Sequence, residues 1–156
     1  MGGAIAQEMA RHLPARALIL LGSLRSGEEL RSAIRFYGEN ISVHTPIWIY
    51  EAGAKLVSPV MGKVSGLSEA DVELCREMYD ELPKHFFREG LRMLAEWRGC
   101  DIRIPTLRVH GKDDHIIPLE NTSGVDLAIP NARHLVSISN APEVNAAINN
   151  FLDRTS

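Results

Sequence analysis

Long apolar runs are absent from this sequence. No stretch approaches the ~20 consecutive apolar residues that a transmembrane helix needs. The first 14 residues have neither the basic start nor the apolar run of a signal peptide. We therefore expect no membrane span and take the cytoplasm as the default compartment. Because the chain opens directly into a helical pattern, we also expect the true N-terminus to lie upstream.

Cysteine is scarce, and neither sign of charge dominates. The two cysteines, Cys75 and Cys100, are too few for a disulfide framework, and reduced thiols are favoured over one bridge. The 17 basic residues are mixed with 20 acidic ones, so no basic patch indicates nucleic acid. The spacing of His12, His44 and His85 does not indicate a metal site. The sequence therefore predicts no nucleic-acid partner, no metal and no cofactor.

Helices and buried strands alternate at both ends of the 156-residue chain, which has the length of one domain. The run ALILLGS at 17–23 is typical of a strand covered on both faces, as in a parallel sheet. It comes after a helix over 3–13, in which Ile5, Met9 and Leu13 share one face. Two further strands are expected at 106–111 and 125–129, before an amphipathic helix at 142–152. The pattern predicts an α/β fold with a mostly parallel sheet of about three strands flanked by helices.

The middle of the chain has helical patterns and no strand of its own. Ser26 with Glu29 has the spacing of a capping box, and so does Ser68 with Asp71, which predicts a helix start at each place. Short amphipathic helices in this position indicate an insertion over the sheet. We therefore divide the domain into a first core part at 1–23, a helical lid at 24–85 and a C-terminal core at 86–156, which opens with a helix over 86–97.

An aspartate and a histidine stand directly after two of the predicted strands. Asp114 comes just after the strand at 106–111, and His134 comes after the strand at 125–129. Ligands of parallel α/β sheets bind at the carboxyl ends of the strands. A carboxylate beside an imidazole fixes its tautomer and stabilises the imidazolium formed when the histidine takes a proton. Spacing alone leaves the alternative open that Asp114 caps a turn and His134 is a surface residue.

The segment GKDDHIIP resembles the acid loop of α/β-hydrolases, which has the pattern G-x-x-D-x-x-x-P. Gly111, Asp114 and Pro118 fill its three fixed positions, so the resemblance implies that Asp114 is the acid of a catalytic triad. IPNARHL resembles the family's turn into the catalytic histidine, here His134, although Arg133 stands where glycine is usual. NAPEVNAAINNFL is similar to the closing helix of the family. The order of acid before histidine agrees with that fold.

The start MGGAIAQEMA resembles the segment directly after the nucleophile in G-x-S-M-G-G elbows of esterase-like members. The resemblance implies that Met1 is the residue next to the nucleophile, with its N–H as one oxyanion-hole donor, and that Gly2 and Gly3 belong to the elbow. The chain is then the C-terminal part of an α/β-hydrolase without its nucleophile. Since loss of a nucleophile costs several orders of magnitude in rate, we expect the chain as given to be inactive in acyl transfer.

Three residues are candidates for the substrate pocket: Ser23, Trp48 and Phe87. Plain packing is an alternative for the two aromatic residues, and Ser23 lacks the paired glycines of a nucleophile elbow. We interpret His110 as a core histidine with satisfied hydrogen bonds and His115 as an exposed loop residue. Between Pro118 and the strand at 125–129 there is room only for a loop, where family members usually insert a helix.

The resemblance implies a hydrolase of carboxylic esters or related small acyl substrates, acting by a Ser-Asp-His mechanism. Two alternatives stay open. One is a fragment of an Asp-nucleophile hydrolase, of the dehalogenase or epoxide hydrolase type. The other is a non-catalytic protein that binds a partner or forms a homodimer through the unpaired apolar edge of the strand at 17–21.

Overall fold

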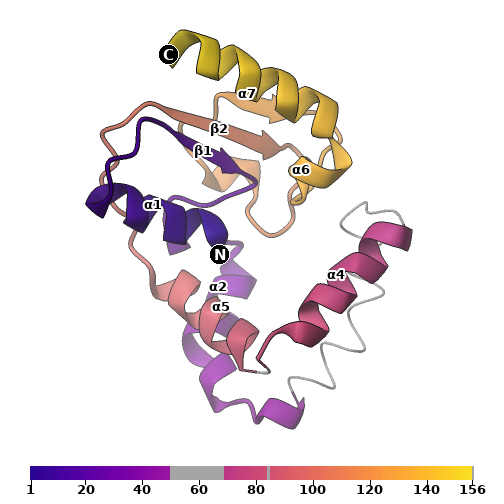
Figure 1. Cartoon of the computed structure of the whole chain (residues 1–156). Coiled ribbons are helices and arrows are strands. Elements are labelled where there is room, and N and C mark those ends of the chain that lie inside the picture. The colour runs from indigo at the N-terminus through magenta and orange to yellow at the C-terminus, as the bar shows by residue number, and fades with distance from the viewer. Residues whose placement is uncertain (50–68, 84, 156) are drawn as a thin grey trace.

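A computed structural model describes residues 1–49, 69–83 and 85–155 of the chain (Figure 1). Its sheet has three parallel strands in the order β1 (Leu18–Leu21), β2 (Thr106–Gly111) and β3 (Leu127–Ile129). The register pairs Leu18 with Thr106 and Val109 with Leu127. The predicted α/β fold with a parallel sheet of about three strands is therefore confirmed.

The two faces of β2 have different neighbours. Leu107 and Val109 point to the face that α7 (Ala141–Thr155) and the short α6 (Val136–Ser139) cover. The main apolar core forms there, from Leu107, Val109, Ile129, Ala132, Val136 and Val144. Because side chains alternate along a strand, Arg108 and His110 point to the opposite face, and both are fully buried. One face of the sheet thus has an apolar core, and the other buries polar groups.

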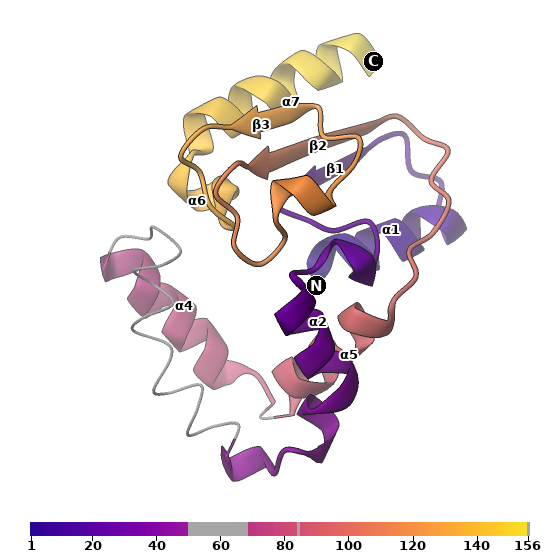
Figure 2. The ribbon, with the colours of Figure 1, turned by 180° about the vertical axis from the view of Figure 1, so that it is seen from behind.

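Helix α1 (Gly2–His12) packs against β1, on the side of the sheet away from α7 (Figures 1 and 2). Its small residues allow a close approach, since a methyl group on Gly3 would overlap the hydroxyl of Ser23. The buried α1 residues are Ala4 and Gln7, whose amide donates to the carbonyl of Leu24 at 2.9 Å. The apolar face is turned outward: its residues Met1, Ile5, Met9 and Leu13 are between 40% and 53% exposed.

The helical part lies beside the sheet. Helix α2 (Ser32–Asn40) and helix α5 (Phe86–Glu96) pack against each other, and α4 (Glu69–Glu81) stands apart from them in both views (Figures 1 and 2). Two short 3₁₀ helices, η1 (Gly27–Glu29) and η2 (Ser42–His44), flank α2. A second apolar cluster joins this part to the loop after β2, through Leu24, Leu30, Ala95 and Ile117. The end of the helical part nearest the sheet, which we call its base, therefore packs against the acid loop.

The structure corrects the predicted capping box at Ser26 and Glu29. Ser26 makes no capping hydrogen bond through its side chain, only a 3₁₀ turn comes after it, and α2 begins later, at Ser32. The Glu29 carboxylate instead accepts hydrogen bonds from the Arg108 guanidinium and from the backbone N–H of Arg25. Glu29 therefore forms a buried ion pair instead of capping a helix, which is the role that the local pattern predicted for it.

Other predicted boundaries fall close to the observed ones. The helices expected over 3–13, 86–97 and 142–152 correspond to α1, α5 and α7. The short segment after Pro118 contains only a 3₁₀ turn, η3 (Leu119–Asn121), as the sequence predicts. The second capping pattern involves Ser68, which lies outside the described residues. Within the described part of the chain, every helix is too short or too polar to cross a membrane.

Candidate active site

Asp114 and His134 meet at the carboxyl ends of β2 and β3. The Asp114 Oδ2 and His134 Nδ1 atoms lie 2.8 Å apart, in hydrogen-bonding contact. The Asp114 side chain is fully buried, whereas 27% of the His134 side chain is exposed. The imidazole is therefore held from its buried side and keeps a face open toward solvent.

The Asp114 carboxylate accepts hydrogen bonds at both oxygens. Its Oδ1 receives the backbone N–H groups of Ile116 at 2.8 Å and Ile117 at 2.9 Å. Burial alone would raise the pKa of Asp114. The hydrogen bonds from His110, His134 and Ile117 and the charge of His134 outweigh burial, so this pKa lies well below its ordinary value. Asp114 is consequently an ionised acceptor at neutral pH.

An ionised carboxylate fixes the state of the His134 ring. Because Oδ2 of Asp114 can only accept, Nδ1 of His134 carries a proton. In the neutral ring the lone pair is then on Nε2, which is the nitrogen available to take a proton. No serine or cysteine among the described residues makes a hydrogen bond to that nitrogen. The pair can therefore act as a general base with an orienting acid, and the described residues contain no partnered nucleophile.

Two glycines let the His134 turn lie against the strand ends. A methyl group on Gly111, the last residue of β2, would overlap the carbonyl oxygens of Ala132 and Arg133. A methyl group on Gly22, just after β1, would overlap the carbonyl oxygen of His134. Both close approaches exclude a side chain. The acid-loop glycine is thus needed for contact with the histidine turn.

The unusual Arg133 does not strain this turn. Among the described non-glycine residues, only Asn131 has a positive φ, of 58°. Asparagine tolerates the left-handed region better than most residues. Since Arg133 is not in that region, the arginine stands in for the usual glycine without a backbone penalty.

The N-terminal residues of α1 lie near the end of β1. Gly3 contacts Ser23, and space is open around Gly2. The N–H groups of Ala4 and Ile5 both bond to the Met1 carbonyl, so the helix begins here. The first N–H groups of a helix lack partners within the helix and favour negative charge. The predicted elbow residues thus stand where a helix begins, close to the strand that also contacts His134 through Gly22.

The predicted pocket residues have different surroundings. Ser23 is half-buried, and its carbonyl accepts a hydrogen bond from Arg108 at 2.8 Å. Trp48 is 70% exposed. Phe87 is half-buried at the start of α5 and packs edge-to-face on Phe86, with ring centres 5.6 Å apart. The structure therefore brings Ser23 close to α1 and β1, and places the two aromatic residues on the helical part.

Two buried polar residues of β2, Arg108 and His110, belong to this region, although their sequence pattern did not predict it. Arg108 bonds to both carboxylate oxygens of Glu29 and to the carbonyls of Ser23 and Ser123. His110 lies with its Nε2 atom 3.3 Å from Asp114 Oδ2. The sequence signal for both was the placement of polar residues at alternate positions of an otherwise apolar strand.

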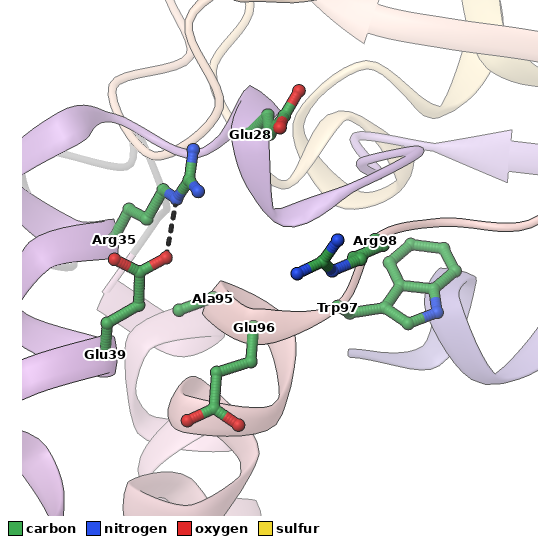
Figure 3. Close-up of a pocket in the computed structure, with 7 residues that line it drawn as sticks. All are labelled: Glu28, Arg35, Glu39, Ala95, Glu96, Trp97 and Arg98. Atoms are coloured by element: carbon green, nitrogen blue, oxygen red, sulfur yellow. Dashed lines mark hydrogen bonds and ion pairs between the residues drawn. The ribbon is translucent and has the colours of Figure 1, made fainter.

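A cavity of about 430 Å³ lies elsewhere, between η1, α2 and α5 (Figure 3). It is lined by Glu28, Arg35, Glu39, Ala95, Glu96, Trp97 and Arg98. Arg35 and Glu39 pair at 2.7 Å, so much of its charge is neutralised within the wall. None of the predicted site residues lines this cavity. In the described part of the chain, no three histidine, cysteine or acidic residues are grouped to hold a metal ion.

Comparisons with known proteins connect this architecture to a fold. No family model and no curated protein matches the chain. A thermophilic esterase from Thermogutta terrifontis superimposes with a TM-score of 0.70 at 19% identity, over 99% of this chain and 62% of the esterase. A structure described as a thermophilic esterase gives a TM-score of 0.63 at 19% identity, over 99% of this chain and 63% of its own.

A third neighbour is MGS-M2, an α/β hydrolase from a deep-sea metagenome library. It has a TM-score of 0.57 at 16% identity, over 97% of this chain and 62% of the hydrolase. The chain thus spans less than two thirds of the length of each of these structures. Together with the parallel sheet and its flanking helices, these likenesses show that the chain has the α/β-hydrolase fold, of which it forms the C-terminal portion.

Proposed function

We propose that this chain carries the acid and histidine of a hydrolase active site that acts on small carboxylic esters or related acyl compounds. The observation that carries the proposal is the 2.8 Å contact between buried Asp114 and partly exposed His134 at the carboxyl ends of parallel strands. The description of two structural neighbours as esterases supports the substrate class.

In the proposed reaction, Nε2 of His134 takes the proton of a serine hydroxyl as that oxygen attacks the ester carbonyl. Asp114 holds the ring and stabilises the imidazolium, which then protonates the leaving alcohol. Water, activated by the same histidine, hydrolyses the acyl-enzyme. The backbone N–H of Met1, as the residue next to the nucleophile in the complete fold, is one donor to the oxyanion.

The nucleophile in this proposal belongs to the part of the fold that the neighbours have beyond their match to this chain. The sequence Met1-Gly2-Gly3 favours serine over aspartate there. Residues 24–85 serve as the lid, and their base packs on the acid loop through contacts of Leu24 and Leu30 with Ile117. The complete activity therefore needs more of the fold than this chain contributes.

An activated ester tests the pair in the chain itself. Without its nucleophile the chain is expected to lack the serine-dependent reaction, but it should still release p-nitrophenol slowly from p-nitrophenyl acetate, since an oriented imidazole can act as base or nucleophile on a reactive ester. His134→Ala should reduce the rate to the background of the exposed imidazoles and amines, and Asp114→Asn should lower it by about tenfold or more through loss of the correct tautomer. Unactivated esters should not be turned over.

The matched controls are Asp113→Asn and His115→Ala, which change exposed neighbours of the acid in the same loop. Both should hydrolyse p-nitrophenyl acetate at the wild-type rate. A folded His134→Ala protein as fast as the wild type would contradict the proposal, because the observed hydrolysis would then arise elsewhere on the surface.

A further inference from the structure

We propose that His110 is a positioning residue for the acid and histidine: it holds the acid loop closed and donates to the carboxylate oxygen that orients His134. This inference rests on the proposed function, since positioning matters only if the pair acts in chemistry. It concerns a residue for which the sequence indicated only a place in the core.

His110 lies on β2, four residues before Asp114, and is 0% exposed. Its Nε2 atom is 2.8 Å from the carbonyl oxygen of Ile117 and 3.3 Å from Oδ2 of Asp114. A carbonyl oxygen can only accept, so Nε2 must carry a proton whatever the charge of the ring. This N–H group therefore donates to an oxygen of the loop, and an oxygen of the acid lies within contact of the same nitrogen.

Ile117 closes a ring of hydrogen bonds with these two residues. Its backbone N–H donates to Oδ1 of Asp114 at 2.9 Å, while its carbonyl accepts from His110. The loop thus wraps around the carboxylate, and His110 joins the end of the loop back to the strand on which it began. The terminal torsion of an aspartate is soft, so contacts at both oxygens are what hold its plane. The same plane sets the direction of the bond to His134.

The other ring nitrogen of His110 argues against a role in packing alone. Nδ1 is buried and has no hydrogen-bond partner among the described residues. A buried polar atom without a partner is costly, and an apolar ring of similar size would avoid that cost. The opposite neutral tautomer would bury an N–H without an acceptor and remove the donor from Ile117 and Asp114. The surroundings of His110 therefore favour the tautomer with the proton on Nε2, which is the one that can donate to Ile117 and Asp114.

Two amide substitutions separate positioning from packing. In His110→Gln the amide nitrogen can reach the place of Nε2, whereas in His110→Asn the side chain is too short. Both bury one amide, so they form a matched pair. His115→Asn, at an exposed position in the acid loop, is the surface control.

The main measurement is ¹⁵N NMR of the His134 ring, which reports which nitrogen carries the proton. We expect His110→Asn to be folded by circular dichroism, to mix the two His134 tautomers and to raise the measured pKa of Asp114. Its rate with p-nitrophenyl acetate should fall severalfold, a smaller loss than the tenfold or more expected of Asp114→Asn. His110→Gln should restore all three readouts, and His115→Asn should change none.

The positioning role is overturned if folded His110→Asn keeps the wild-type His134 tautomer and the wild-type titration of Asp114. It is also overturned if His110→Gln is as impaired as His110→Asn, because packing of the ring would then explain both. Failure of the proposed function has a different signature. In that case wild type and His134→Ala hydrolyse the ester equally, while the NMR comparison still reports on His110.

Discussion

Asp114 is the residue on which the candidate site depends. Its carboxylate is buried, a situation that by itself favours the neutral acid. Donors from His110, His134 and the backbone reverse that preference, so the folded protein holds a carboxylate whose pKa lies well below the ordinary value. Two of these donors come from the acid loop itself, at Ile116 and Ile117. The ionised form of Asp114 is thus stabilised by the folded conformation of the acid loop.

This lowered pKa predicts acid sensitivity of the fold. In the unfolded chain an aspartate has a pKa of about 3.9. Since the folded value is lower, Asp114 stabilises the fold above that pH, and its contribution is lost as pH falls through about 4 toward the folded pKa. Asp114→Asn should therefore reduce the difference in unfolding free energy between pH 7 and pH 3, measured by urea titration.

The control for this measurement is Asp113→Asn, which removes an exposed carboxylate next in sequence. It should keep the wild-type pH dependence. An Asp114→Asn protein that loses as much stability between the two pH values as the wild type does would show that other groups carry the acid sensitivity.

Strand β2 is tied to the start of the helical part by a buried ion pair. Arg108 is 1% and Glu29 is 6% exposed, and the guanidinium also reaches the carbonyls of Ser23 and Ser123. The pair therefore joins β2, the segment after β1 and the segment before β3. This arrangement explains why Glu29 does not cap a helix, since its carboxylate has a charged partner in the sheet.

Removal of one partner should destabilise the protein strongly. Glu29→Gln leaves the Arg108 guanidinium buried without its counter-charge, and we expect a loss of about 3–5 kcal/mol in unfolding free energy. Glu28→Gln, which changes the exposed neighbour, should stay within ~0.5 kcal/mol of the wild type. Urea unfolding measures both variants. Equal stability of Glu29→Gln and Glu28→Gln would mean that the pair contributes little to holding these elements together.

At the level of the whole molecule, one strand edge and one apolar helix face are left open. β1 is an edge strand of the sheet, with β2 as its only partner among the described residues. On α1, which packs on β1, the face formed by Met1, Ile5, Met9 and Leu13 is about half exposed. An open strand edge is a template for pairing with another chain. The homodimer that the sequence left open as an alternative, formed through the edge of β1, therefore stays a prediction.

We therefore predict concentration-dependent self-association through this side of the molecule. Ile5→Lys and Met9→Lys should shift the protein toward monomer, because a charge on the helix face opposes its burial against a second copy. Met93→Lys, at an exposed apolar position on α5, is the matched control and should behave as the wild type does. Sedimentation equilibrium is the measurement. A wild-type chain that stays monomeric across the concentration range contradicts the prediction.

Local patterns in the sequence were sufficient for the strands, for most of the helices and for the location of Asp114 and His134 directly after strands. Alternation, apolar runs and turn residues act over a few neighbours, so they are readable without a fold. The tertiary structure determined which distant residues they contact. Asp114 and His134 are 20 residues apart, and Glu29 and Arg108 are 79 apart. His110 became part of the site, and the apolar face of α1 was turned outward, because burial depends on which elements pack together and no local pattern contains that information.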